Sequence, residues 1–296
     1  MKNIHVFKTE LPSISEFEAA LIENEKLMFT RCGDHDFSRF GFSPKATLTM
    51  LSNGYKIAYT FQEKKIPSAT VKELVDEKVA DFEKTEERPI LRRERNEFKE
   101  QVLKHLCTKA LTTTTTFEAF YHTEHKLLVV DIASEALASS ALKLICHCLQ
   151  SVKTETLHVS AISNSLAINL AKSIRQNVDL GFAGFTLGDK LHLENVDGEQ
   201  VKYKGDYSLE HIEDLIADDY VVKLITLKKD NITFDFTSEL RIKSIRVDPE
   251  LFDEIDADDV DDERLIREAT TLELMVNICL DLVNYFDKAA ETNKRK

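Results

Sequence analysis

The sequence predicts an α+β fold (mixed α/β), with a central α/β domain, a helical hairpin inserted into it and a β-rich second module. Strand-like and helical segments alternate through the first and middle parts of the chain. Two apolar stripes of helical period, separated by Pro89, predict the hairpin. A series of short strand-like segments after Leu180 predicts the second module.

At 296 residues the chain exceeds the usual size of one domain, so a division into parts is expected. We expect residues 1–66 and 111–178 to form the central domain and residues 67–110 the hairpin. Residues 179–255 form the expected β-rich module. Residues 256–296 hold an acidic segment and a C-terminal helix that we expect to pack on the central domain.

The chain begins with a predicted strand and helix. Ile4 and Val6 alternate with polar neighbours, as in a strand with one buried face, and Ser13 or Ser15 can cap the helix that follows. The next segment, RCGDHDFSRFGFSP, contains two glycines and ends in a proline, so it is predicted to be an ordered loop. A further strand is predicted at GYKIAYTFQ.

The hairpin is predicted from two apolar stripes on either side of Pro89. Its members are Val71, Leu74, Val75, Val79 and Phe82 in the first stripe, and Leu91, Phe98, Val102 and Leu106 in the second. Each arm would hold roughly 17 to 20 residues and span about 25 to 30 Å at 1.5 Å per residue. Such a hairpin has too little apolar surface to be a domain alone, so its seam must also meet another element or a second copy of itself.

After the hairpin, the runs TTTTTFEAFYH and HKLLVVDIA predict paired strands, because β-branched threonines suit a pleated surface. SEALASSALKLICHCLQ predicts a helix and ETLHVS a short strand. SNSLAINLAKSIRQN predicts a second helix, capped by Ser163 or Asn164.

Six short strands and one helix are predicted in the β-rich module. The strands are FAGFTL, KLHLEN, VKYKG, DYVVKLITLK, NITFDFT and LRIKSIRV, and the helix is SLEHIEDLIAD. Ten acidic residues and no basic residue then lie between Asp248 and Glu263, ahead of the helix LIREATTLELMVNICLDLVNYF. We interpret this acidic run as a solvated helix entry, with contact to a basic surface or a cation site as the alternatives.

Composition and charge restrict the classes of function. The N-terminus lacks an apolar run of secretory length, and the chain has no apolar run long enough to span a membrane, so we expect a cytoplasmic protein with no membrane partner. The five cysteines are odd in number and are interpreted as reduced thiols. Cys146 and Cys148 flank His147, but no second ligand pair follows at zinc spacing, so no metal is expected.

The motifs of common enzymes are missing from the sequence. It contains no Walker loop, no GxGxxG, no GxSxG and no HExxH, and the acidic run lacks the glycine and glutamate of an EF-hand loop. His35, His122 and His125 are interpreted as surface or capping residues. We therefore expect a protein without enzymatic activity, catalytic residues or cofactors.

A basic stretch stands out because the whole chain carries a net charge of −13. Eight cations and five anions lie between Lys84 and Lys109, which gives this segment a net charge of +3. Arg92, Arg95 and Lys99 fall within roughly 60° of one another on a helical projection at about 100° per residue. Pairing at i, i+4 and solvation alone would also explain these charges.

A second group of cations lies in the β-rich module. Lys202 and Lys204 share one face of a strand with Tyr203 opposite, and Lys223, with Lys228 and Lys229, lies on or just after a neighbouring strand. Lysines of this kind also protect sheet edges from aggregation, and that alternative stays open.

Several segments together resemble the recombination-associated protein RdgC family. They are FTRCGDHDFSRFGFSP, KKIPSATVKELVDEKVADFE, VLKHL, LLVVDIAS and GFTL, in this order, followed by a terminal helix rich in D-x-L. The resemblance covers nearly the whole chain. It implies a ring-forming homodimer in which the hairpins meet at one interface and the β-rich modules at the other.

The resemblance also implies a function. Family members bind double- and single-stranded DNA with little sequence preference and restrain RecA-driven strand exchange, which places this chain with the nucleoid. Carried over by position, Arg88, Arg92 and Lys204 match basic residues of the family. Where relatives carry a Pro-Arg-Ala-Phe-like run, this chain ends the stretch with Leu111. Leucine can wedge between bases but cannot stack on them, which puts a duplex-distorting role in doubt.

We therefore expect a sequence-tolerant DNA-binding protein that inhibits RecA-dependent recombination by competing for DNA. The candidate DNA-binding residues are Lys84, Arg88, Arg92, Arg95, Lys99, Lys109, Leu111, Lys202, Lys204 and Lys223. Two alternatives remain. One is an acidic interaction module that binds the recombinase directly, and the other is a divergent enzyme that acts on nucleic acid.

Overall fold

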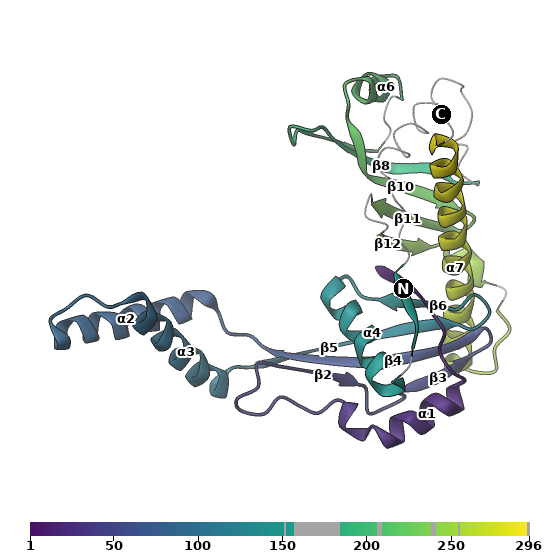
Figure 1. The fold of residues 1–296 in the computed structure, drawn as a ribbon. Coiled ribbons are helices and arrows are strands. Elements are labelled where there is room, and N and C mark those ends of the chain that lie inside the picture. Colours follow the sequence, from purple (N-terminus) through teal and green to yellow (C-terminus); the bar gives the residue numbers. More distant parts are fainter. Residues whose placement is uncertain (151, 157–183, 206–208, 238–240, 254, 295–296) are drawn as a thin grey trace. The chain divides into compact units, whose positions relative to one another are not determined.

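The structure is a computed structural model of the chain, and it describes residues 1–150, 152–156, 184–205, 209–237, 241–253 and 255–294. The chain forms two compact units (Figure 1). Unit 1 comprises Met1–Glu18, Leu48–Ile57 and Glu118–Lys296, and unit 2 comprises Ala19–Thr47 and Ala58–Phe117. Two long strands, β4 (Gly54–Lys64) and β5 (Thr112–His122), contribute residues to both units.

The predicted α+β class is confirmed. The ladders of β1 with β6, β7 and β12, of β4 with β2 and β3, of β5 with β6, and those that join β8 to β12 are antiparallel. In unit 1 the strand order is β5-β6-β1-β12-β11-β10-β8-β9, with β3 on β4 and β7 on β1. The bounds are β1 Ile4–Thr9, β3 Leu48–Leu51, β6 Leu127–Asp131, β7 Thr154–Thr156, β8 Thr186–Glu194, β9 Gln200–Lys204, β10 Val221–Lys229, β11 Ile232–Thr237 and β12 Ile242–Val247.

The core of unit 1 lies between one face of this sheet and the long helix α7 (Val260–Lys294), which runs across the strands in Figure 1. Leu272, Met275 and Val276 of α7 are fully buried in one cluster with Phe234 and Phe236 of β11. Helix α6 (Leu209–Ala217) adds Ile212 to this cluster, and α4 (Glu135–Leu149) adds a buried stripe of its own in unit 1.

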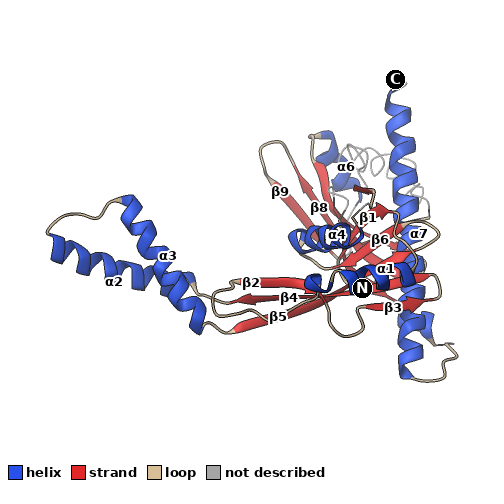
Figure 2. Ribbon diagram, turned by 60° about the horizontal axis from the view of Figure 1, so that its bottom comes forward, coloured by secondary structure: helices blue, strands red, loops and turns tan. Residues whose placement is uncertain are grey.

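Unit 2 carries the helical hairpin and the strand β2 (Ser38–Phe42). Helices α2 (Ser68–Glu86) and α3 (Arg92–Lys109) lie side by side in Figure 2. Val71, Val75 and Val79 of α2 pack on Val102 of α3 and form a small core. These helices correspond to the two apolar stripes in the sequence. Leu91 is an exception, because it precedes α3 and is 63% exposed, so its assignment to the seam was wrong.

The first helix, α1 (Ile14–Glu23), begins as the capping signal predicts, because Ser13 and Glu16 bond each other. The segment predicted as a loop after it was assigned incorrectly in part. It contains β2, whose Phe40 and Phe42 alternate with Arg39 and Gly41 and pair with Phe61 and Tyr59 of β4. A short 3-10 helix, η1 (Glu25–Leu27), precedes it.

The sequence predicts two strands in the β-rich module, FAGFTL and KLHLEN. This separation was wrong, because residues Thr186–Glu194 form the single strand β8. Gly188 does not break it. A Cβ at Gly188 would stand 2.4 Å from Thr226 Cγ2, so glycine here allows β8 and β10 to approach closely.

Helix α7 is longer than the sequence predicted, and Asp261, Asp262 and Glu263 stand in its first turn, where they complement the helix dipole. A second 3-10 helix, η2 (Pro249–Phe252), precedes it. The helix predicted at residues 163–177 and most of the strand ETLHVS lie outside the described residues. Among the described residues, no helix is long and apolar enough to cross a membrane.

Candidate nucleic-acid interface

Arg88, at the hairpin turn, is neutralised by Glu94. Its two terminal nitrogens donate to the Glu94 carboxylate at 3.0 and 2.7 Å, and its guanidinium lies 4.8 Å from the centre of the Phe82 ring. Glu94 also accepts from the backbone N–H of Leu91 at 2.9 Å. The bonds from Arg88 and then from Leu91 lower the Glu94 pKa to about 2. The arrangement fixes the turn between α2 and α3.

Arg95 forms a second ion pair across the hairpin. Its Nη2 lies 2.5 Å from Oδ1 of Asp76 on α2. Both side chains are about half exposed, at 49% and 47%, so the pair contributes little to stability. Arg88 and Arg95, two of the predicted DNA contacts, therefore already have carboxylate partners within the hairpin.

Other predicted hairpin cations are exposed and have no ion-pair partner among the described residues. They are Lys84 of α2 and Arg92, Lys99 and Lys109 of α3. The structure does not gather the predicted cluster completely, since Arg95 and Lys99 line one groove and Arg92 does not. Leu111 follows α3 and is 84% exposed, and its carbonyl accepts from the N–H of Lys65 at 3.1 Å.

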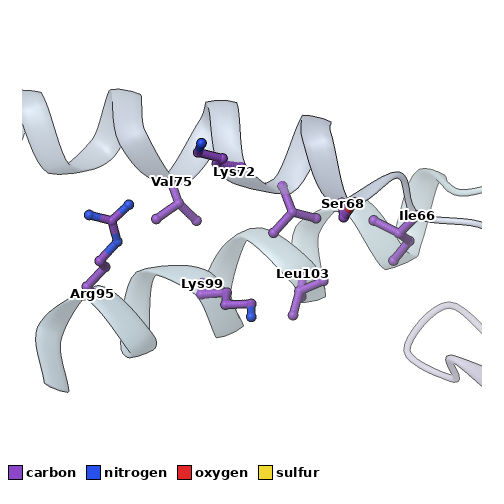
Figure 3. A pocket seen from close by; sticks show the side chains of 8 residues that line it. Ile66, Ser68, Lys72, Val75, Arg95, Lys99 and Leu103 are labelled. Atoms are coloured by element: carbon purple, nitrogen blue, oxygen red, sulfur yellow. The ribbon is translucent and has the colours of Figure 1, made fainter. Parts of the chain in front are cut away.

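The groove lies between α2 and α3, as Figure 3 shows from close by, and has a volume of about 420 Å³. It is lined by Ile66, Ser68, Val71, Lys72, Val75, Arg95, Lys99 and Leu103. Lys72, which also lines the groove, was not among the cations predicted to bind DNA. Its i, i+3 spacing from Val75 would have placed it beside the apolar stripe.

In unit 1, the sheet presents a basic face opposite its apolar face. Directly opposed residues of an antiparallel ladder point to the same side. Lys204 stands opposite Lys190, and Lys202 stands opposite His192. The intervening residues Leu191 and Tyr203 point to the core side, where Leu191 is fully buried. The predicted shared face of Lys202 and Lys204 therefore extends onto β8.

The same face continues over β10, β11 and β12. Lys228 stands opposite Thr233, which in turn stands opposite Arg246, and Lys243 stands opposite Asp235. We define the basic sheet face by its six cations, Lys190, Lys202, Lys204, Lys228, Lys243 and Arg246. Lys190, Lys243 and Arg246 were not predicted from the sequence, although their alternation with apolar neighbours is visible in KLHLEN and LRIKSIRV.

Asp235 anchors the centre of this face. It is buried, and its carboxylate accepts from Lys190 Nζ at 2.8 Å and from Thr226 Oγ1 at 2.7 Å. Burial alone would raise the Asp235 pKa, but the hydrogen bonds from Lys190, Thr226 and Ser244 outweigh it and keep that pKa below its ordinary value. Lys190 is thus paired with Asp235. In contrast, Lys202, Lys204 and Lys228 have no ion-pair partner among the described residues.

His192 lies among these lysines. Burial, and then the charge of Lys202, lower its pKa. The imidazole is therefore neutral at pH 7, and a phosphate approaching the face would favour its protonation.

Lys223 takes a different position from the predicted one. The neighbour of β9 is β8, and β10 lies one strand further. The register shifts between Val222 and Leu224, so Lys223 is the extra residue of a bulge. Its Nζ lies 3.2 Å from Glu194 Oε1. Lys229 points to the core side, where it pairs with Asp281.

Lys228 and Arg246 also line an open hollow of about 660 Å³ with three aspartates, Asp189, Asp230 and Asp248. Arg246 lies 3.6 Å from Asp189. Within the described part of the chain, no group of three or more His, Cys, Asp or Glu side chains could hold a metal ion.

These features define an α+β protein with a basic sheet face and a helical hairpin that carries exposed cations. Residues 1–289 match the family described as "Putative exonuclease, RdgC". The chain belongs to the RdgC family.

Similar proteins carry the name "Recombination-associated protein RdgC". The protein from Aeromonas hydrophila subsp. hydrophila is 28% identical over 266 residues, which cover 86% of each chain. The protein from Colwellia psychrerythraea is 28% identical over 275 residues, which cover 88% of this chain and 87% of the relative. The relatives' name refers to recombination, whereas the family description refers to an exonuclease.

Proposed function

We propose that this protein binds DNA without reading its sequence and thereby modulates recombination. The observation that carries the proposal is the basic sheet face, where six cations from the four strands β8, β9, β10 and β12 share one side of a sheet whose other side is the core. Lysine and arginine on a pleated surface suit the regularly spaced phosphates of a nucleic-acid backbone.

The charge of the whole chain does not oppose this function. Contacts to phosphate act over short distances in salt, because the Debye length is about 8 Å at physiological ionic strength. A local concentration of cations can thus attract DNA although the net charge is −13. The cations of the face include only one arginine, and its Asp189 neighbour occupies it, so bidentate reading of guanine is not expected.

We further propose the assembly that the family resemblance implies, a homodimeric ring that encloses DNA and competes with RecA for it. Contacts to DNA are assigned first to Lys202, Lys204 and Lys228, which lack ion-pair partners within the described residues. Lys84, Arg92 and Lys109 are proposed as the contribution of the hairpin.

The test compares a variant of the face with a matched control. The double substitution Lys202→Glu and Lys204→Glu should weaken binding to every DNA sequence by about tenfold or more, and the slope of log K against log salt should become shallower by about 1.8. Lys143→Glu with Lys153→Glu changes the charge equally, on exposed residues of unit 1 that are not among the six cations of the face. Equal losses in both variants would contradict the proposal.

The ring is tested with DNA topology. A ring loaded on a closed circle should be retained in high salt and released once the circle is cut, as measured by co-sedimentation. Retention on linear DNA would contradict encirclement.

The same incubation with Mg²⁺ or Mn²⁺ tests the alternative that the protein is an exonuclease. Release of nucleotides from linear DNA by the purified protein, but not by the variant Lys202→Glu with Lys204→Glu, would show an enzyme.

A further inference from the structure

The hairpin groove offers a binding site of a different chemistry from the basic sheet face. Its floor is aliphatic, formed by Val71 and Val75 of α2, Leu103 of α3 and Ile66. Its rim is cationic, with Lys72 on one helix and Lys99 with Arg95 on the other (Figure 3). A volume of about 420 Å³ is enough for one or two aliphatic side chains with part of their backbone.

The charges on the rim are available to a ligand. Lys72 and Lys99 are exposed and have no carboxylate partner among the described residues, whereas Arg95 is paired with Asp76. The N-terminal end of α2 adds to this field, because Ser68 lines the groove, no side chain caps the helix, and its first turn holds no acidic residue. The free N–H groups at such an end favour an anion.

We propose that this groove binds an acidic peptide segment of a partner protein, with an aliphatic side chain of the segment on the valine floor and its carboxylates at Lys72 and Lys99. Two features argue against other occupants. The lining contains no aromatic ring to stack on a base and no amide to read one, so it is poorly suited to an unpaired nucleotide. Two copies meeting groove to groove about a two-fold axis would bring the same lysines against each other.

The probe is a labelled peptide of six aspartates followed by two leucines, with an amidated end, and binding to the full chain is measured by fluorescence anisotropy without DNA. We expect saturable binding that weakens with salt. A peptide of six aspartates and two serines tests the floor, and a peptide of six asparagines and two leucines tests the rim. Each should bind about tenfold more weakly or worse.

The variant Lys72→Glu with Lys99→Glu should abolish peptide binding. Its matched control, Lys84→Glu with Lys104→Glu, makes the same charge change on the same two helices outside the groove lining and should keep it. Leu103→Trp should fill the groove and weaken peptide binding without changing the charge. Circular dichroism verifies that each variant keeps its helices.

DNA binding is measured separately on the same variants, so that failure of this proposal and failure of the proposed function can be told apart. The variant for this comparison is Leu103→Trp, because it changes no charge. Peptide binding that is lost in Leu103→Trp while its DNA binding stays within about twofold supports the proposal. Four results would overturn it: no binding of the aspartate–leucine peptide, equal binding of the serine-ended peptide, loss of DNA affinity in Leu103→Trp, or loss of self-association in that variant. The last two would assign the groove to DNA or to a second copy.

Discussion

At the residue scale, Lys56 is the clearest case of a charge that the fold depends on. Its side chain is 6% exposed and its Nζ lies 3.0 Å from Glu118 and 2.8 Å from Glu268, all within unit 1. A buried cation of this kind is tolerated because it is paired twice. Its removal would leave two carboxylates close together without compensation.

We therefore expect Lys56→Met to lower the free energy of unfolding of unit 1 by about 3 kcal/mol at pH 7. Urea denaturation followed by tyrosine fluorescence measures this, since the chain contains seven tyrosines and no tryptophan. Lys126→Met is the matched control in unit 1, because Lys126 and Glu10 form an exposed pair, whose loss should cost less than about 1 kcal/mol. Similar losses in both variants would contradict this account of Lys56.

Burial also determines how reactive the cysteine thiols are. Cys279 of α7 lies in the core, and burial raises its pKa to about 12. Cys32 and Cys146 are partly exposed, and burial raises their pKa values as well. At pH 8 we expect iodoacetamide to label Cys32 and Cys146 slowly and Cys279 only after unfolding, as measured by mass spectrometry of peptides. Rapid labelling of Cys279 in the native protein would show that α7 opens.

At the scale of the element, the hairpin turn depends on the ionised form of Glu94. Its pKa in the folded chain is about 2, below the ordinary value of 4.5. A lowered carboxyl pKa means that the stabilising effect is present above pH 4.5 and is lost as the pH falls toward 2. The hairpin should then fray at its turn in acid before the two helices separate.

Glu94→Gln should reproduce this fraying at pH 7. Amide hydrogen exchange at residues 87–95 should become faster in the variant at pH 7, and between pH 4.5 and pH 2 it should change only as the intrinsic exchange rate does. Glu97→Gln is the control, because Glu97 contacts only the exposed Arg93 among the described residues. Unchanged exchange in Glu94→Gln would show that the turn is held by packing alone.

Elements with local signals were predictable from the sequence, and elements that depend on distant partners were predictable only in part. The helices α2 and α3 follow from valines at helical spacing and from Pro89 between them. In contrast, β2 was hidden, because Gly41 and Pro44 are typical of a loop and only pairing with β4 makes Ser38–Phe42 a strand. Leu91 failed as a seam residue because a capping position faces outward.

The candidate interface follows the same rule. The shared side of Lys202 and Lys204 was visible in one strand, since side chains alternate along it. The strand order and the bulge at Lys223 are not written in any single segment, because they depend on ladders between residues far apart. Nor did the sequence indicate that Arg88 and Arg95 are neutralised by Glu94 and Asp76.

At the scale of the whole molecule, the proposed function implies that the net charge and the basic sheet face would act on DNA over different distances. At about 0.01 M salt the Debye length is about 30 Å, so approaching DNA would respond to the net charge of −13. At about 0.1 M it is about 10 Å, and the face would act alone at contact. At low salt, most basic DNA-binding proteins are attracted to DNA over long distances by their net positive charge. This protein would lack that long-range attraction.

The association rate constant for DNA should therefore stay flat or rise between 10 and 100 mM salt, while the dissociation rate constant rises steadily, as measured by stopped-flow anisotropy. Neutralising the exposed carboxylates with Asp253→Asn, Asp256→Asn and Asp258→Asn should raise the association rate constant at 10 mM salt and leave it unchanged at 200 mM, because salt already screens these charges there. The dissociation rate constant should not change, since these aspartates are not on the basic sheet face. An association rate constant that falls steeply with salt in the unmodified protein would contradict this account. It would mean that the cations attract DNA even at long range and that the net charge does not govern the encounter.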